Sequence, residues 1–156
     1  MQKITQCLWF DSNAEEAVNF YTSVFKDAKI GEVARYGDAG PGPKGSVMTA
    51  TFELFGQKFI ALNGGPLFKF SEAISMVVNC ENQEEVDYYW EKLSEGGQEQ
   101  QCGWLKDKFG LSWQVVPTEL PSLFTGDGAK SQKAMQAMMK MKKLDINILK
   151  QAYQEG

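Results

Sequence analysis

The chain has 156 residues, a formal net charge of −4 and a sequence pI near 4.9. This length is typical of one domain that builds its own hydrophobic core. Basic residues form no extended stripe, so the charge pattern argues against a nucleic-acid-binding protein. No apolar run approaches the roughly 18 residues of a membrane span, and the N-terminal residues lack the apolar segment of a signal peptide. We therefore expect a cytoplasmic protein with no membrane partner.

The sequence contains no histidine and three cysteines. The first observation excludes Ser-His-Asp and Cys-His catalysis and any histidine-ligated metal, because histidine is the usual neutral-pH base and metal ligand. Cys7, Cys80 and Cys102 are an odd set without C-x-x-C spacing, which favours reduced thiols that serve as packing residues.

The first elements along the chain are a strand and a helix. Residues 4–10 are apolar at most positions, apart from Gln6, as in a strand covered on both faces. The polar run 11–13 supplies N-cap residues, and apolar residues then recur at helical spacing. The pattern predicts a helix from about Ala14 to Phe25.

Three strands should complete the first half of the chain. The pattern places them at residues 29–36, 46–55 and 58–63, the last two joined by a Gly56-Gln57 turn. The glycine-rich loop at 37–45 is no nucleotide cradle, because Pro41 and Pro43 remove two backbone donors and the order Lys44-Gly45-Ser46 reverses that of a phosphate-binding loop. Residues 1–66 thus form a βαβββ module.

The second half repeats this order in shortened form. Residues 84–90 echo residues 15–21 at an offset of 69 (84 − 15 = 69), which indicates a duplicated module. Strands are expected at 74–79, 98–101, 103–107 and 111–116, with a helix that 81–83 caps and that runs to about Ser94. Residues 67–118 form this second module within a single domain spanning 1–156.

Residues 119–156 form a C-terminal helical extension. A turn is expected at 121–124, a helix with a methionine-bearing apolar face at 131–144, and a last short helix capped by Asp145. Those methionines are interpreted as packing on the outside of a sheet or at a dimer contact.

Several segments resemble one known family. They are Leu8-Trp9-Phe10-Asp11, residues 14–17 with Phe20-Tyr21, residues 39–43, residues 62–66 with Phe68-Lys69-Phe70, residues 72–75, and residues 101–107 running into 111–117. Together they resemble the PhnB-like family, whose members often carry the name demethylubiquinone methyltransferase, within the vicinal-oxygen-chelate superfamily of glyoxalases, bleomycin-resistance proteins and dioxygenases. The resemblance implies an α+β fold in which two paired βαβββ modules form an open, curled, barrel-like sheet with outer helices. It also implies a homodimer.

Superfamily enzymes hold a metal with residues on the first and last strands of each module. By resemblance, those positions fall at or within one residue of Gln6, Asn63, Ser75 and Gln114, and none of these is histidine or carboxylate. Neutral amides and a hydroxyl are poor ligands for divalent transition metals, so no catalytic metal is predicted. The four side chains could bind a ligand or simply hydrogen-bond one another.

Two functions follow from this pattern. The first is a glyoxalase/bleomycin-resistance-like protein that binds an unidentified small molecule, with Gln6, Asn63, Ser75 and Gln114 as polar anchors and Phe68, Phe70 and Trp104 among its walls. The alternative is a vicinal-oxygen-chelate enzyme of lyase, dioxygenase or isomerase type with a weakly bound divalent metal. Methyl transfer, which the family name suggests, is disfavoured because the chain has no glycine-rich adenosylmethionine loop. No catalytic residue is identified, and Lys106 and Asp107, at a hairpin, are interpreted as solvated charges.

Two expectations concern geometry. Gln6 and Gln114 should face the barrel interior from the first and last strands, away from the helices, and their side chains should approach each other across the pseudo-twofold. The segment 64–70 should act as a lid or wall of the pocket, because its glycines permit unusual backbone angles and Phe68 and Phe70 offer two rings.

Overall fold

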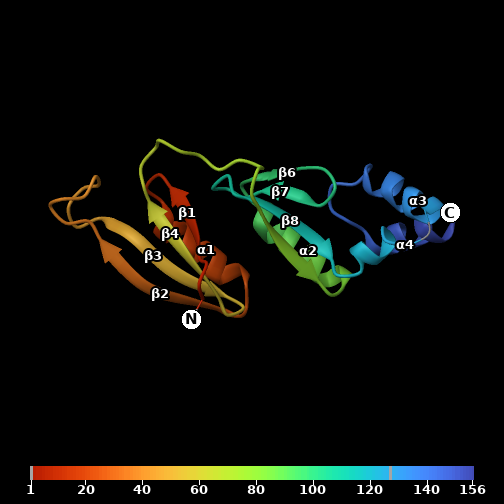
Figure 1. Ribbon diagram of the computed structural model, residues 1–156, viewed down its shortest axis with the longest axis horizontal. Coiled ribbons are helices and arrows are strands. Elements are labelled where there is room, and N and C mark those ends of the chain that lie inside the picture. Colours follow the sequence, from red (N-terminus) through yellow and green to blue (C-terminus); the bar gives the residue numbers. More distant parts are fainter. Residues whose placement is uncertain (1, 127) are drawn as a thin grey trace. The chain divides into compact units, whose positions relative to one another are not determined.

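The computed structural model describes residues 2–126 and 128–156 (Figure 1). Its fold is α+β, as expected, with two separate four-stranded mixed sheets. Contacts divide the chain into two compact units, one ending at Phe70 and the other running from Ser71 to Gly156. The C-terminal extension belongs to the second unit. Within the described residues, no helix has the length and apolar character needed to cross a membrane.

The first unit is a βαβββ module. Its elements are β1 (Gln6–Phe10), α1 (Ala14–Val24), β2 (Ala28–Arg35), β3 (Val47–Leu54) and β4 (Gln57–Asn63). The strand order is β1-β4-β3-β2, with β1 parallel to β4 and the other pairs antiparallel. The predicted strands and helix of this half are confirmed to within about two residues at their ends, the usual uncertainty of element boundaries.

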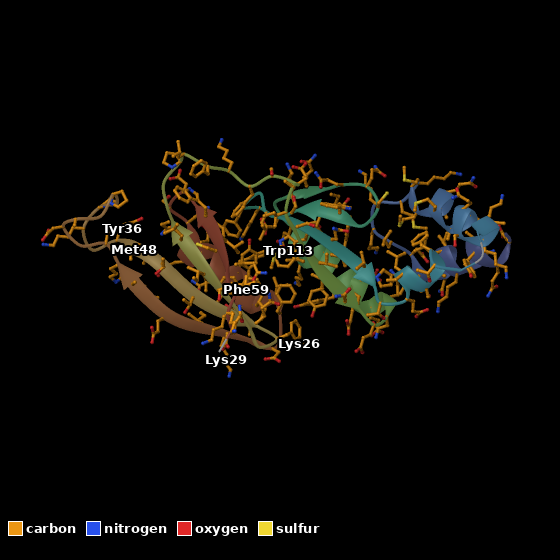
Figure 2. The ribbon with its side chains drawn as sticks, viewed as in Figure 1. Lys26, Lys29, Tyr36, Met48, Phe59 and Trp113 are labelled. Carbon is orange, nitrogen blue, oxygen red and sulfur yellow. The ribbon has the colours of Figure 1, made fainter. Side chains whose placement is uncertain are left out.

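The core of the first unit lies between α1 and one face of its sheet. Apolar residues of α1 at helical spacing, among them Ala17 and Tyr21, are almost fully buried. The Tyr21 ring stacks on Phe52 of β3 with centroids 5.9 Å apart, and Phe52 stacks on Phe59 of β4 at 5.1 Å. Phe59 is labelled in Figure 2. This row of rings fixes which face of the sheet α1 covers.

The second unit begins with a second βαβββ module. Its elements are β5 (Ser75–Cys80), α2 (Gln83–Ser94), β6 (Gln98–Glu99), β7 (Trp104–Lys106) and β8 (Ser112–Pro117). The order β5-β8-β7-β6 repeats that of the first sheet, again with the outer pair β5 and β8 parallel. The predicted duplication is therefore confirmed at the level of topology.

The core of the second unit lies under α2. Val86 and Leu93 of α2, Leu105 of β7 and Val115 of β8 have no measurable exposure, and Trp113 is 3% exposed. Asn82 caps the helix as predicted, since its side chain accepts a hydrogen bond from Glu85 N at 2.9 Å. Of the three cysteines, Cys80 is buried in this core and Cys102 is half-buried, whereas Cys7 of β1 is exposed and does not pack within its own unit.

The C-terminal extension contains a short 3-10 turn at Leu120–Leu123, α3 (Gly128–Met138) and α4 (Ile146–Gln154). Asp145 caps α4 as predicted. The expectation that the methionine-bearing helix continues to Leu144 is wrong, because the chain leaves helical geometry to pair with the second module. Met141 O and Lys142 O accept hydrogen bonds from the backbone N–H groups of Cys102 and Gly103, both at 2.8 Å.

Candidate functional site

One face of the second sheet is not covered by its helix. Along β5, Val78 and Cys80 point into the core under α2, so the alternation of a strand places Ser75 and Val77 on the opposite face. Val77 is 50% exposed there. We call this side of the sheet the open face of the second unit.

Three of the predicted ligand-binding residues meet on this open face. Gln114 of β8 donates a hydrogen bond from its side-chain Nε2 to the Ser75 Oγ at 2.9 Å. Trp104 of β7 lies directly opposite Gln114 in the antiparallel register. All three side chains are half-buried. Strands far apart in sequence thus bring together a hydroxyl, an amide and an indole, which can bind polar and apolar parts of one molecule.

A charged pair borders the same group. Lys106 Nζ lies 3.1 Å from Glu72 Oε1, and the side chains are 30% and 50% exposed. This contact lowers the pKa of the Glu72 carboxyl below its ordinary value. The sequence interpretation treated Lys106 as a solvated hairpin charge and did not single out Glu72. The available signal was the spacing of Trp104 and Lys106, which puts both on one face of β7.

Ser112 is the other residue that sequence reasoning missed. It lies opposite both Lys106 of β7 and Ser75 of β5 in the sheet register. Its side chain is fully buried, and its Oγ has no hydrogen-bond partner. A buried hydroxyl without a partner lowers the stability of the fold and is rare in proteins, and this one lies beside the candidate site.

Asp107 was also expected to be a solvated hairpin charge, and this expectation is wrong. Asp107 is only 2% exposed. Its carboxylate accepts hydrogen bonds from Phe109 N at 2.8 Å, Leu111 N at 3.1 Å and Trp113 Nε1 at 2.9 Å. These bonds fix the turn between β7 and β8 and anchor the strand that carries Gln114.

Gln6 does not face away from the helix, contrary to the prediction. It lies opposite Phe59 in the β1–β4 register and accepts a hydrogen bond from Gln57 Nε2 at 3.2 Å. Leu8 and Phe10, which share its side of β1, are buried under α1. Gln6 itself is exposed at the start of that face.

Asn63 serves the structure of the first unit. Its Oδ1 accepts a hydrogen bond from Ala14 N at 2.8 Å, and its Nδ2 donates to Val47 O at 3.1 Å. Its backbone carbonyl accepts the Tyr36 hydroxyl at 2.5 Å. The side chain thus joins the end of β4 to the starts of α1 and β3, and both ends of the amide are occupied.

The two predicted wall residues of the linking segment lie against different residues of β1. The Phe68 ring contacts Trp9 edge-on with centroids 4.9 Å apart and is 59% exposed. The Phe70 ring contacts Phe10 at 5.2 Å and is half-buried. Neither ring is buried beneath a helix, so both remain accessible to a ligand.

A hollow of about 460 Å³ lies in the first unit, between the glycine-rich loop and the start of α1. Arg35, Tyr36, Pro41, Glu15 and Gly64 contribute to its lining. Tyr36 is labelled in Figure 2. The loop is held at its base, since Tyr36 exchanges backbone hydrogen bonds with Gly45 and Ser46. These bonds close the base of the loop, and residues of the loop form one wall of the hollow.

The residues at the superfamily's metal positions do not fit a metal. Both ends of the Asn63 amide make hydrogen bonds in the scaffold, Ser75 and Gln114 bond each other, and Gln6 lies on the helix side of its sheet. Among the described residues, no cluster of three or more histidine, cysteine, aspartate or glutamate side chains could hold an ion. Neutral oxygen donors alone give little compensation for dehydrating a divalent transition metal.

Two βαβββ modules with matching strand order define a protein of the vicinal-oxygen-chelate superfamily. Residues 2–116 match the model of the family described as 3-demethylubiquinone-9 3-methyltransferase. The chain belongs to this PhnB-like family.

Solved structures show the same fold. A PhnB protein from Bacillus cereus is 41% identical, with a TM-score of 0.69 over 75% of this chain and 100% of its own. Protein PA1353 from Pseudomonas aeruginosa is 22% identical, with a TM-score of 0.62 over 75% and 98% of the two chains. The fosfomycin resistance protein FosX from Listeria monocytogenes is 14% identical, with a TM-score of 0.57 over 78% and 94%. A search of curated proteins gave no match.

Proposed function

We propose that this protein binds a small, partly apolar molecule on the open face of the second unit, without a catalytic metal. The observation that carries the proposal is the hydrogen bond between Gln114 and Ser75 beside the Trp104 ring. A flat ring next to a few fixed polar groups is the usual composition of a small-molecule site.

Support also comes from the way the site is built. Gln114 and Trp104 project from strands of a packed sheet, and Asp107 secures the turn between those strands with buried hydrogen bonds. Binding side chains on such a rigid scaffold lose little conformational entropy when a ligand arrives. Gln114 Oε1 remains an acceptor after its Nε2 has been used, so the amide can still orient a ligand.

The test is to identify what the protein retains. We expect mass spectrometry of molecules released from purified protein to find a compound that the Gln114→Leu and Trp104→Ala variants retain at least about tenfold less well. Gln151→Leu, at an exposed position of α4, is the matched control and should retain the compound fully. If both site variants retained the compound as well as the unmodified protein does, the compound would bind elsewhere. A protein that retains nothing and is stabilised by no member of a broad metabolite panel would contradict the proposal.

Metal analysis separates this function from the enzymatic alternative. A vicinal-oxygen-chelate enzyme would purify with, or be activated by, iron, manganese, zinc or nickel, as the manganese complex of FosX illustrates for a structural neighbour. If the protein purified with stoichiometric metal and the Ser75→Ala variant did not, the enzymatic alternative would replace the proposed binding function. We expect no such stoichiometry, because the donors are neutral.

The methyltransferase description of the family is not part of the proposed function. A methyl donor needs a site for adenosylmethionine, and the chain has no glycine-rich loop between a strand and a helix of the kind that commonly binds nucleotide-like cofactors. Calorimetry with adenosylmethionine tests this directly, and micromolar binding would restore the methyltransferase hypothesis.

A further inference from the structure

Lys106 brings a positive charge to the open face of the second unit. In the sheet register it lies opposite Ser112 of β8, which in turn lies opposite Ser75 of β5. Because neighbouring strands are about 4.8 Å apart, these three residues form one row across the sheet. An ammonium group in line with two hydroxyl groups is an arrangement that suits an oxyanion.

The two hydroxyl groups of this row retain donor capacity. Ser75 Oγ accepts the hydrogen bond from Gln114, so its own hydrogen is free to donate. Ser112 Oγ is buried and has no partner at all. Buried polar atoms are nearly always satisfied in folded proteins, so an unsatisfied hydroxyl beside a lysine points to a missing acceptor.

The next row of the same face carries two apolar side chains. It contains Trp104 of β7 and the half-exposed Val77 of β5, on either side of Gln114. Successive rows on one face of a strand are about 6.6 Å apart, which is close to the distance between an acid group and a ring carried on the same small molecule. The face therefore offers a polar row for a charged head and an apolar row for a body.

Glu72 already places a carboxylate at Lys106. Its Oε1 lies 3.1 Å from Lys106 Nζ, and its Oε2 accepts a hydrogen bond from Gln100 Nε2 at 3.5 Å. Glu72 lies just before β5, outside the strands, and its side chain is 50% exposed. An exposed ion pair contributes little to stability, so a second carboxylate can replace this one at small cost.

From these observations we infer that the open face recognises an organic anion, a carboxylate or phosphoryl compound with an apolar body, and that Glu72 is the internal competitor for its place at Lys106. The inference rests on the proposed binding function and adds the chemical class of the ligand. Binding exchanges one anion for another at Lys106, while Trp104 and Val77 contact the apolar body.

The probes are phenylacetate, phenylphosphonate and the neutral phenylacetamide, each titrated by calorimetry into the full chain. We expect one or both anions to bind at least about tenfold more tightly than the amide, and the two anions to distinguish carboxylate from phosphoryl recognition. Glu72→Gln should strengthen anion binding about tenfold, because the competing charge is removed. Lys106→Met should weaken it by a similar factor, and Ser112→Ala should weaken it less.

A second ion pair of the same unit provides the matched control. Lys143 Nζ lies 2.9 Å from Asp87 Oδ1 at α2, so Asp87→Asn and Lys143→Met remove equal charges away from the open face. Both controls should bind the anions as the unmodified protein does. Binding of phenylacetamide as tight as that of both phenylacetate and phenylphosphonate would overturn the anion inference while leaving small-molecule binding intact. Failure of Glu72→Gln protein to bind either anion would also overturn it, and release of a neutral molecule from purified protein would show that only the anion inference had failed.

Discussion

The side-chain Oδ1 of Asn63 accepts a hydrogen bond from Ala14 N at 2.8 Å, so the last residue of β4 caps a helix that begins 49 positions earlier. The local N-cap candidate, Asn13, makes no side-chain hydrogen bond to the helix. The start of α1 is therefore held by a tertiary contact.

The first prediction follows from this cap. Asn63→Ala should lower the free energy of unfolding by about 1–3 kcal/mol, because it removes the cap and leaves Val47 O without the amide donor. Asn13→Ala is the control and should change it by less than about 0.5 kcal/mol. Urea unfolding followed by circular dichroism measures both. Equal losses in the two variants would show that Asn63 does not carry the cap.

The two rings of the linking segment give a second prediction. Phe68→Ala and Phe70→Ala should each lower the free energy of unfolding only modestly, because neither ring lies in a helix-covered core. Phe68→Ala should lower the free energy of unfolding by about 1 kcal/mol, the usual size of one aromatic contact. Losses of roughly 3–5 kcal/mol in thermal unfolding would instead identify core residues.

Cys80 makes stability depend on alkaline pH. Burial raises the pKa of its thiol from the ordinary value of 9.0 to about 12, with a smaller contribution from the Glu85 carboxylate. The folded state thus favours the neutral thiol, and this stabilisation is complete below about pH 9 and is lost as the pH rises toward about 12. As the pH rises from about 8 to about 10.5, this difference in pKa should lower the free energy of unfolding by about 2 kcal/mol.

The comparison with Cys80→Ala isolates this contribution. The variant keeps every other alkaline group, so its unfolding free energy should fall by about 2 kcal/mol less than that of the unmodified protein over the same pH range. Parallel declines in urea denaturation would mean that the thiolate is tolerated in the core.

The fourth prediction concerns assembly. Met135 of α3 and Met139, which directly follows α3, are 36% and 62% exposed, whereas Ala134 is buried. We expect this apolar stripe to form part of a homodimer contact, because flexible methionine side chains adapt well to a second surface. Sedimentation velocity should show a dimer that Met135→Gln/Met139→Gln weakens and Lys133→Gln does not. A monomer at micromolar concentration would contradict the prediction.

The sequence determined the elements and their order because side-chain periodicity is local. The duplicated helical pattern predicted α1 and α2 at a constant offset, and the buried positions Ala17 and Val86 keep it (86 − 17 = 69). The hairpin turn was predicted at Gly56-Gln57 and lies one residue earlier, at Phe55-Gly56. This turn and the cap at Asn82 were readable because each depends mainly on neighbouring residues.

Only the tertiary structure decided which face of each strand is covered. The buried positions Leu8 and Val78 are separated by 70 residues (78 − 8 = 70), one more than the helices. A shift of one residue reverses every side chain of a strand, so Gln6 faces α1 while Ser75 faces away from α2. The contacts of Asn63, Asp107 and Lys106 likewise depend on partners from other segments or on burial. A polar side chain makes such contacts only when folding brings the partner within hydrogen-bonding distance.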